Sequence, residues 1–246
     1  MILKKCIAFD NPCYTQSSRI QGKPFGIVVH STGCDNEYLK RYVQPSETDS
    51  EKNNILKDIG VNVYSNDLNK SNAEICMHAF IGKNAKDIVE VYQTLPYDIC
   101  CWGCGRGSKG SYNYNPTPCI QFEICEDDLT DKEYFNKAFQ AAIEYCAYLV
   151  NLYKIPIDHI VSHKEACALG YASNHGDPDH WLQKYGKSMN WFRDEVTKAV
   201  NANTDTDTEI YYCVQVGAFK SRENAEAMLA KLKKSGYNGY ITTKGV

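Results

Sequence analysis

Short apolar runs bounded by polar turns recur through the first half of the chain and predict buried strands. The first covers residues 25–30 and ends at a histidine, His30. Residues 78–81 and 88–92 flank a polar loop with glycine and asparagine, a pattern typical of a hairpin. A further apolar run covers residues 119–125. Runs of this length between turn residues indicate strands of a largely buried sheet.

Helical spacing replaces this pattern in the next segment. Residues 131–153 carry apolar side chains every three or four positions, which predicts a long amphipathic helix packed on a sheet. Thr130 and Glu133 fit a capping box at its start, and Leu129 fits the hydrophobic staple. The aromatic residues of the helix are therefore assigned to the core. The apolar stripe consists of Phe135, Phe139, Ala142, Cys146, Leu149 and Tyr153.

A shorter helix is predicted for residues 36–43, where Asp35 is placed to cap the first turn and Pro45 follows the last. Helices thus alternate with strands before residue 200. This alternation indicates an α/β domain with a central mixed β-sheet flanked by helices.

A polar run of low complexity, residues 201–208, has no side chain suited to a core and predicts a linker. It divides the chain into a large domain, residues 1–200, and a small unit, residues 209–246. In the small unit, residues 211–219 alternate like a strand and residues 240–243 begin another. We therefore expect a C-terminal β-α-β unit.

The helix of this small unit has clear start and stop signals. Ser221 is placed to cap it and Gly236 to end it. Its apolar stripe consists of Ala225, Met228, Leu229 and Leu232.

Composition narrows the class of protein. The chain has 246 residues, 43% of them hydrophobic and 23% charged, which argues against disorder. It has no apolar stretch of about 18 residues, so no membrane span is expected. A net charge of −3 gives no sign of nucleic-acid binding. Residues 1–10 lack the apolar core and cleavage site of a signal peptide, so we expect synthesis in the cytoplasm.

Twelve cysteines are a high number, but without a signal peptide free thiols are favoured over disulfides. The tightest cluster, residues 100–104, contains one C-x-x-C pair and no second pair at zinc-ribbon spacing. A cysteine zinc site or redox pair is therefore the weaker interpretation. Four cysteines have apolar neighbours that favour burial: Cys76, Cys119, Cys125 and Cys146.

Histidines and carboxylates mark the candidate chemistry. His30 and His163 each follow an apolar run, so a fold could bring them together at strand ends. Two imidazoles and one carboxylate would make a three-ligand zinc site with a fourth position for water. The third ligand lies in the loop beyond His163, where the candidates are Asp177, Asp179, His180, His175 and Cys167.

Glu123 lies within an apolar strand, where a carboxylate is unfavourable unless it faces a polar site. It is therefore the candidate general base for hydrolysis by an activated water. The alternative is an ordinary solvent-facing residue, because alternation would place Glu123 and Gln121 on the same face of the sheet.

Five segments in this order resemble the zinc-dependent N-acetylmuramoyl-L-alanine amidase family, which includes phage endolysins and peptidoglycan recognition proteins. The resemblance covers residues 20–200. The segments are Val28-Val29-His30-Ser31-Thr32, Met77-His78-Ala79-Phe80-Ile81, Ile120-Gln121-Phe122-Glu123, Val161-Ser162-His163 and His175-Gly176-Asp177-Pro178.

The resemblance implies a Zn²⁺ cofactor held by His30, His163 and Asp177. It implies that Glu123 transfers protons and that His175 stabilises the tetrahedral intermediate. The fourteen residues from His163 to Asp177 exceed the usual interval and imply an insertion.

The substrate contacts implied by the resemblance are His78, Thr32 and Trp102. His78 either lines the groove or supports the site, and an ordinary strand histidine is the alternative. Related amidases often have a histidine after the tryptophan, whereas this chain has Trp102-Gly103-Cys104.

The implied activity is hydrolysis of the amide between the lactyl group of N-acetylmuramic acid and L-alanine in peptidoglycan. The alternatives are a recognition protein that binds peptidoglycan without cleaving it and a zinc endopeptidase acting on the stem peptide. A cytoplasmic start implies a phage or prophage endolysin that reaches the wall after release, with a bacterial autolysin as the alternative.

Residues 209–246 resemble the first half of a SPOR domain, a module associated with glycan strands stripped of their peptides. The run Val214-Gln215-Val216-Gly217-Ala218-Phe219 carries the resemblance. So short a unit buries too little surface to be stable alone. Three explanations are open: the module is truncated, it packs on the large domain, or two copies pair their half-modules into one sheet. Our hypothesis is the last, a symmetric homodimer.

Overall fold

The computed structural model describes residues 1–204, 216–237, 239 and 241. The chain forms two compact units, Met1–Asp205 and Thr206–Val246.

The first unit is built on one six-stranded sheet in the order β1-β4-β3-β5-β2-β6. Only β3 and β4 pair in antiparallel fashion, as the predicted hairpin; the other neighbours are parallel. The expected mixed α/β sheet is confirmed. The strands are β1 (Leu3–Lys5), β2 (Gly26–Ser31), β3 (Ala79–Lys83), β4 (Val89–Gln93), β5 (Cys119–Ile124) and β6 (Ile160–Ser162).

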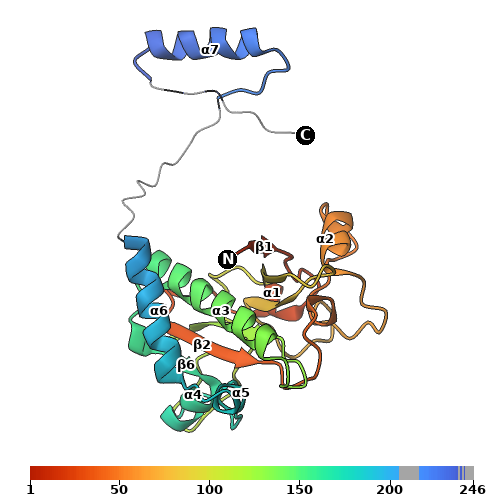
Figure 1. Ribbon diagram of the computed structural model, residues 1–246, viewed down its shortest axis with the longest axis vertical. Coiled ribbons are helices and arrows are strands. Elements are labelled where there is room, and N and C mark those ends of the chain that lie inside the picture. The colour runs from red at the N-terminus through yellow and green to blue at the C-terminus, as the bar shows by residue number, and fades with distance from the viewer. Residues whose placement is uncertain (205–215, 238, 240, 242–246) are drawn as a thin grey trace. The chain divides into compact units, whose positions relative to one another are not determined.

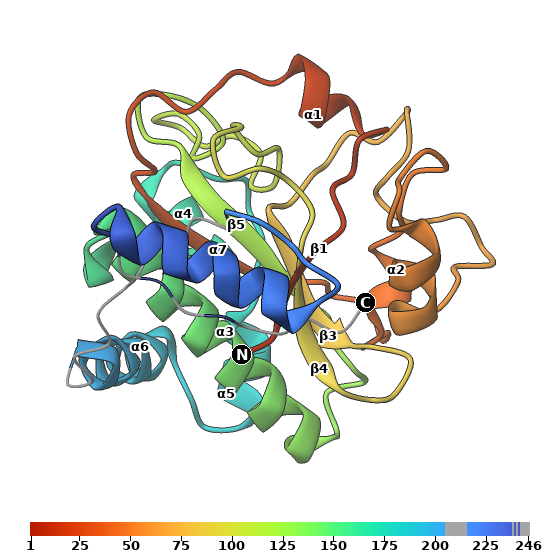
Figure 2. The ribbon, with the colours of Figure 1, turned by 90° about the horizontal axis from the view of Figure 1, so that it is seen from above.

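Helices cover both faces of this sheet. Helices α3 and α6 lie side by side along one face (Figure 1), and the sheet passes between them and the side that carries α1 and α2 (Figure 2). The helices of this unit are α1 (Pro12–Gln16), α2 (Lys52–Ile59), α3 (Lys132–Tyr153), α4 (His163–Leu169), α5 (Asp179–Lys184) and α6 (Met189–Thr204), with 3₁₀ turns η1 (Leu39–Arg41) and η2 (Ile157–His159).

The predicted helix over residues 36–43 is wrong, since only η1 is helical there. Tyr38 forms a parallel bridge with Lys83 at the end of β3, which holds the segment extended. The Asn36 side chain accepts a hydrogen bond from the Tyr38 backbone, a local bond that competes with helix formation. Tertiary pairing thus overrides the local pattern.

The long helix α3 confirms the predicted apolar stripe, which packs against the sheet. Its cap differs from the prediction. Asp131 is the N-cap and its side chain accepts from the Tyr134 backbone N–H at 2.9 Å. The Thr130 hydroxyl instead donates to Asp128. The capping box is therefore one residue away from the real helix start.

This correction gives a stability prediction. Asp131→Ala will lower the free energy of unfolding by about 1 kcal/mol, because the helix loses the acceptor for one of its free N–H groups. Thr130→Ala, the matched control at the neighbouring exposed position, will change it by less than about 0.5 kcal/mol. Urea unfolding followed by circular dichroism measures both. Equal losses in the two variants would restore Thr130 as the cap.

Side chains along β5 alternate between the core and the face that carries the candidate site residues. Ile120, Phe122 and Ile124 pack in the core beneath α3. Gln121 and Glu123 therefore project from the opposite face of the sheet. The polar residues predicted for the site lie on the side away from α3.

In the second unit, helix α7 (Arg222–Lys234) confirms the predicted helix. Ser221 occupies the N-cap position, but its side chain makes no capping hydrogen bond, and Gly236 follows the C-terminus with a φ of 86°. None of its residues is buried, and the apolar stripe is only half-buried.

The two strands predicted on either side of α7 fall mostly outside the described residues, which omit 205–215, 238, 240 and 242–246. Residues 216–219 and 241 are described and are not in strands. The first residues of the expected linker, 201–204, are instead the end of α6. No finding supports the expected homodimer. Among the described helices, none has the length and apolar character needed to cross a bilayer.

Candidate metal centre

Three adjacent parallel strands bring the site together. His30 is the next-to-last residue of β2, Glu123 occupies the same position in β5, and His163 directly follows β6. The carboxyl ends of parallel strands meet at one edge of the sheet, where ligand sites commonly form. Ser162 and Glu165 form a capping box at the start of α4, which fixes His163 in the first turn.

Asp177 completes the group from the loop before α5. Its Oδ2 lies 3.2 Å from His30 Nδ1, and its Oδ1 lies 3.6 Å from His163 Nδ1. The two Nδ1 atoms are 3.0 Å apart. Among the described residues, these three make up the group of side chains able to hold a metal ion.

The geometry and chemistry of the three donors fit zinc. A tetrahedral zinc ion with ligands at about 2.0–2.1 Å has ligand-to-ligand distances of about 3.3–3.4 Å. The separations between the donor atoms, 3.0, 3.2 and 3.6 Å, bracket that value. His30 and His163 are 1% and 2% exposed, and the Asp177 side chain is 12% exposed. Two imidazoles and one carboxylate leave the fourth position open, as in catalytic zinc sites.

Electrostatics keep two of these donors in the state that binds metal. Burial alone would raise the pKa of Asp177, but the hydrogen bond and charge of His30, with His163, hold it below its usual range. Burial, together with the charge of His30, lowers the pKa of His163 to about 4. A neutral imidazole and an ionised carboxylate are the forms that coordinate zinc.

His30 differs in this respect. Burial would lower its pKa, but the hydrogen bond to Asp177 and the charge of Glu123 outweigh burial and raise it. A metal ion bound at Nδ1 would displace the proton shared with Asp177.

The outer ring nitrogens of both histidines are engaged. His30 Nε2 lies 3.1 Å from Gln121 Oε1, and His163 Nε2 lies 3.3 Å from Ser173 Oγ. Such partners orient a metal-binding imidazole. The nitrogens left facing the centre are the two Nδ1 atoms.

Glu123 lies beside this centre. It is paired in register with His30, so in these parallel strands the two side chains project from the same face. Its Oε2 is buried and has no hydrogen-bond partner in the described part of the chain. Burial raises the pKa of Glu123 to about 7; His30 partly offsets this, while Asp177 and Glu126 add to it. Gln121 is buried on the same face, so this face is not the solvent-facing surface of the alternative interpretation.

His175 lies at the solvent side of the centre. Its ring stacks on His163 with centroids 4.6 Å apart, and its Nδ1 is 3.8 Å from Asp177 Oδ1. The side chain is 63% exposed. It is therefore available to a substrate that approaches the three donors from solvent.

Comparison with known families decides the identity. Residues 21–180, well over half of the chain, match the family model for N-acetylmuramoyl-L-alanine amidase. The chain belongs to the N-acetylmuramoyl-L-alanine amidase family. Residues 208–246 match the SPOR domain. A search of curated protein sequences found no significant match.

Solved structures share the fold of this amidase. The hydrolase AmiA of Staphylococcus aureus, crystallised with its ligand, is 18% identical with a TM-score of 0.55, over 85% of this chain and 88% of AmiA. The XlyA catalytic domain is 18% identical with a TM-score of 0.50, over 80% of this chain and 99% of XlyA. The PlyG catalytic domain is 21% identical with a TM-score of 0.50, over 86% and 100%.

The other candidates for the third ligand have different surroundings in the amidase. His180 Nε2 lies 3.1 Å from a carboxylate oxygen of Glu126, which is buried. Asp179 lies in the first turn of α5, and Cys167 in α4. None of them joins the group of His30, His163 and Asp177.

His78, predicted to line the groove or to support the site, lies inside the fold. The amidase buries this side chain completely, and its Nε2 donates to the Ile99 carbonyl at 3.0 Å. Its Nδ1 accepts from the Gln121 backbone N–H at 3.0 Å. Burial lowers its pKa to about 4, so the ring stays neutral. His78 thus joins the Ile99 carbonyl to the backbone of β5, and its contact with substrate stays a prediction.

Thr32 and Trp102 are both half-buried. Thr32 Oγ1 accepts from the Glu126 backbone N–H at 2.9 Å, and Trp102 Nε1 donates to Ser17 Oγ at 3.0 Å. Their contact with substrate stays a prediction.

The cysteines of the described residues form no group able to hold a metal ion. The eleven cysteines within the described residues are free thiols, and none belongs to a potential metal-binding group there. The four cysteines expected to be buried are buried.

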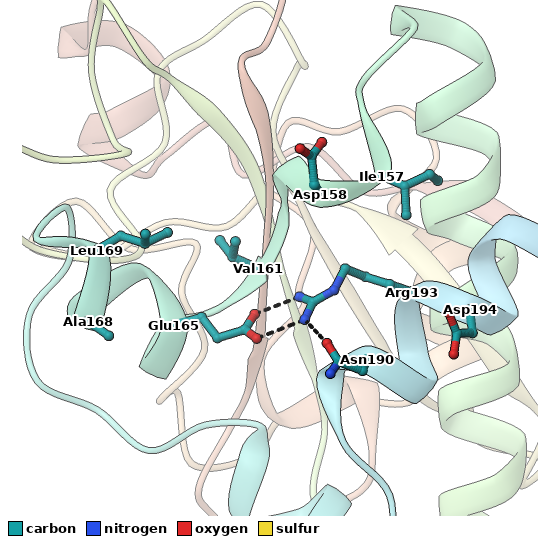
Figure 3. A pocket seen from close by; sticks show the side chains of 9 residues that line it. All are labelled: Ile157, Asp158, Val161, Glu165, Ala168, Leu169, Asn190, Arg193 and Asp194. Carbon is teal, nitrogen blue, oxygen red and sulfur yellow. Dashed lines mark hydrogen bonds and ion pairs between the residues drawn. The ribbon is translucent and has the colours of Figure 1, made fainter.

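A wide groove of about 770 Å³ lies away from the centre, between η2, α4 and α6 (Figure 3). Arg193 crosses it to form a two-point ion pair with Glu165 at 2.8 and 3.0 Å, and also donates to Asn190. The lining includes none of the three metal donors and not Glu123. This groove is therefore distinct from the candidate reaction centre.

Proposed function

We propose that this amidase hydrolyses the amide between the lactyl group of N-acetylmuramic acid and L-alanine in peptidoglycan, at a zinc ion held by His30, His163 and Asp177. One observation carries the proposal. The register of β2 and β5 supports it, because Glu123 is paired with His30 and shares its face of the sheet, beside the group of His30, His163 and Asp177. Family membership supplies the substrate class.

Zinc bound there would supply a Lewis acid that acidifies water and polarises the substrate carbonyl. The rest of the reaction belongs to the side chains. Glu123 removes a proton from the water that attacks the carbonyl carbon, then delivers a proton to the L-alanine nitrogen as it leaves. A pKa of about 7 suits both steps at neutral pH, and the unpartnered Oε2 is free to accept the proton.

His175 stabilises the oxygen of the tetrahedral intermediate. Its exposed ring lies next to Asp177 and stacks on His163, so it can meet a substrate carbonyl at the centre. A donor aimed at a developing oxyanion is a major contributor to amide hydrolysis.

Digestion of purified peptidoglycan by the zinc-loaded full chain, with products identified by mass spectrometry, tests the proposal. Stem peptides with a free L-alanine amino group, together with intact glycan strands, are the expected products. Cuts within the stem peptide would replace the proposal with an endopeptidase. Binding without products would replace it with a peptidoglycan recognition protein.

We further propose that the protein acts as a wall-degrading endolysin of phage type and that residues 208–246 bind glycan strands that have lost their peptides. The match of this segment to the SPOR domain supports the second point, because such strands are the product of the proposed reaction. Co-sedimentation with stripped glycan, but not with fully peptide-bearing peptidoglycan, is the expected result. Equal sedimentation with both would contradict it.

A further inference from the structure

We propose that Asn113 and Gln121 form a polar relay that dictates which ring nitrogen of His30 binds the metal. The inference rests on the proposed function, since it concerns the same metal centre. It adds two positioning residues that take no part in coordination. The relay starts at backbone groups of the segment after Trp102 and ends at His30 Nε2.

The first link is fixed by the backbone. The N–H groups of Gly103 and Cys104 both donate to Asn113 Oδ1, at 3.2 and 3.0 Å. A backbone N–H is always a donor, so the atom that faces both of them must be the oxygen of the Asn113 amide. The orientation of this side chain is thereby determined.

The second link follows from the first. Asn113 Oδ1 also lies 2.8 Å from Gln121 Nε2, which must donate to it. Gln121 therefore turns its Oε1 toward His30, 3.1 Å from Nε2. An amide oxygen only accepts, so His30 Nε2 must carry the proton. The lone pair of a neutral His30 is then on Nδ1, which faces Asp177 and His163.

Burial of the relay fixes which ring nitrogen of His30 carries the proton. Gln121, His30 and Asn113 are all buried, so reversing any member would leave a buried polar group without a partner. Gly103 permits the close approach: a Cβ there would lie 2.5 Å from Gln121 Oε1. His78 fixes the backbone N–H of Gln121 from the other side.

The same segment supports the second histidine. His163 Nε2 lies 3.3 Å from Ser173 Oγ, which donates to the Cys104 carbonyl at 3.2 Å. The peptide groups of Cys104 thus anchor both imidazoles, one through Ser173 and one through the relay. The segment Trp102-Gly103-Cys104, which departs from the pattern of related amidases, has a positioning role here.

The test is the zinc affinity of Gln121→Met in the full chain, measured by competition with a chelating dye. Loss of the acceptor is expected to raise the zinc Kd by about 10–100-fold. In zinc-loaded wild type, ¹⁵N NMR is expected to show a His30 Nε2–H protected from solvent exchange, and Gln121→Met to lose that protection. Gln93→Met is the matched control. Gln93, the last residue of β4, is also buried, and its side-chain amide donates to the Leu95 carbonyl. It should keep wild-type affinity.

A second pair of variants covers the case in which Gln121→Met does not fold. Asn113→Asp keeps an acceptor for the two backbone N–H groups, the Cys104 thiol and Gln121 Nε2, and should bind zinc like wild type, whereas Asn113→Leu should show the weakened affinity. Wild-type affinity in Gln121→Met or in Asn113→Leu would overturn the relay. Absence of zinc from wild type itself would instead overturn the proposed function, so the two failures are distinguishable.

Discussion

Glu123→Gln will lower kcat for the release of stem peptides by about 10²–10⁴-fold while bound zinc stays at the wild-type level. Glutamine keeps the size of the side chain but cannot take a proton from water. The ligand set is untouched, since Glu123 is not one of the three donors. Kinetics on purified peptidoglycan, with zinc content measured on the same samples, make the test.

The same substitution has a second expected result. Burial raises the pKa of Glu123 to about 7, so the ionised carboxyl is unfavourable in the folded chain at higher pH. Above pH 7, metal-free Glu123→Gln will unfold at a temperature equal to or higher than wild type. Glu90→Gln is the matched control: Glu90 is buried on β4 and pairs with Lys4 of β1, two strands or more away from Glu123 in the sheet. That variant should lose stability and keep activity. Activity of Glu123→Gln within tenfold of wild type would remove Glu123 as the base.

His163→Ala and Asp177→Asn will each lose bound zinc and hydrolysis together. Each change removes or weakens one of three donors, so the loss of affinity will exceed the roughly 10–100-fold expected when a supporting hydrogen bond is lost. Zinc content after dialysis and the rate of peptide release are the measurements.

Two matched controls make this result specific. His159→Ala changes a histidine of η2 that lies outside the centre. Its Nδ1 hydrogen-bonds to the Phe25 carbonyl. Asp179→Asn changes the carboxylate two residues beyond the proposed ligand. Both should keep zinc. Zinc lost from Asp179→Asn and kept by Asp177→Asn would reassign the third ligand.

The strands and the two histidines of the candidate centre were predictable because burial leaves a strong pattern in the sequence. The apolar run before His30 and the one before His163 each form a strand of the sheet, and their parallel pairing brings the histidines together. The stripe of α3 follows the same logic. Choosing Asp177 among its neighbours required the family resemblance, because the loop sequence alone fits several ligands.

The corrections share a physical cause, which is pairing between residues distant in sequence. Tyr38 bridges to Lys83 and prevents a helix that local signals favour. The hydrogen bonds of the His78 ring to two backbone groups from other segments likewise had no signal in the sequence. Asn113 and Ser173 had no local signal at all, because each acts on a histidine through contacts that only the folded chain creates.

Locating zinc by anomalous X-ray scattering from crystals of the zinc-loaded chain tests the central claim most directly. The account predicts one site with bonds of about 2.0–2.2 Å to His30 Nδ1, His163 Nδ1 and an oxygen of Asp177, and with Glu123 unbound beside it. Zinc held through His175, His180 or Cys167, or through Nε2 of His30, would contradict it.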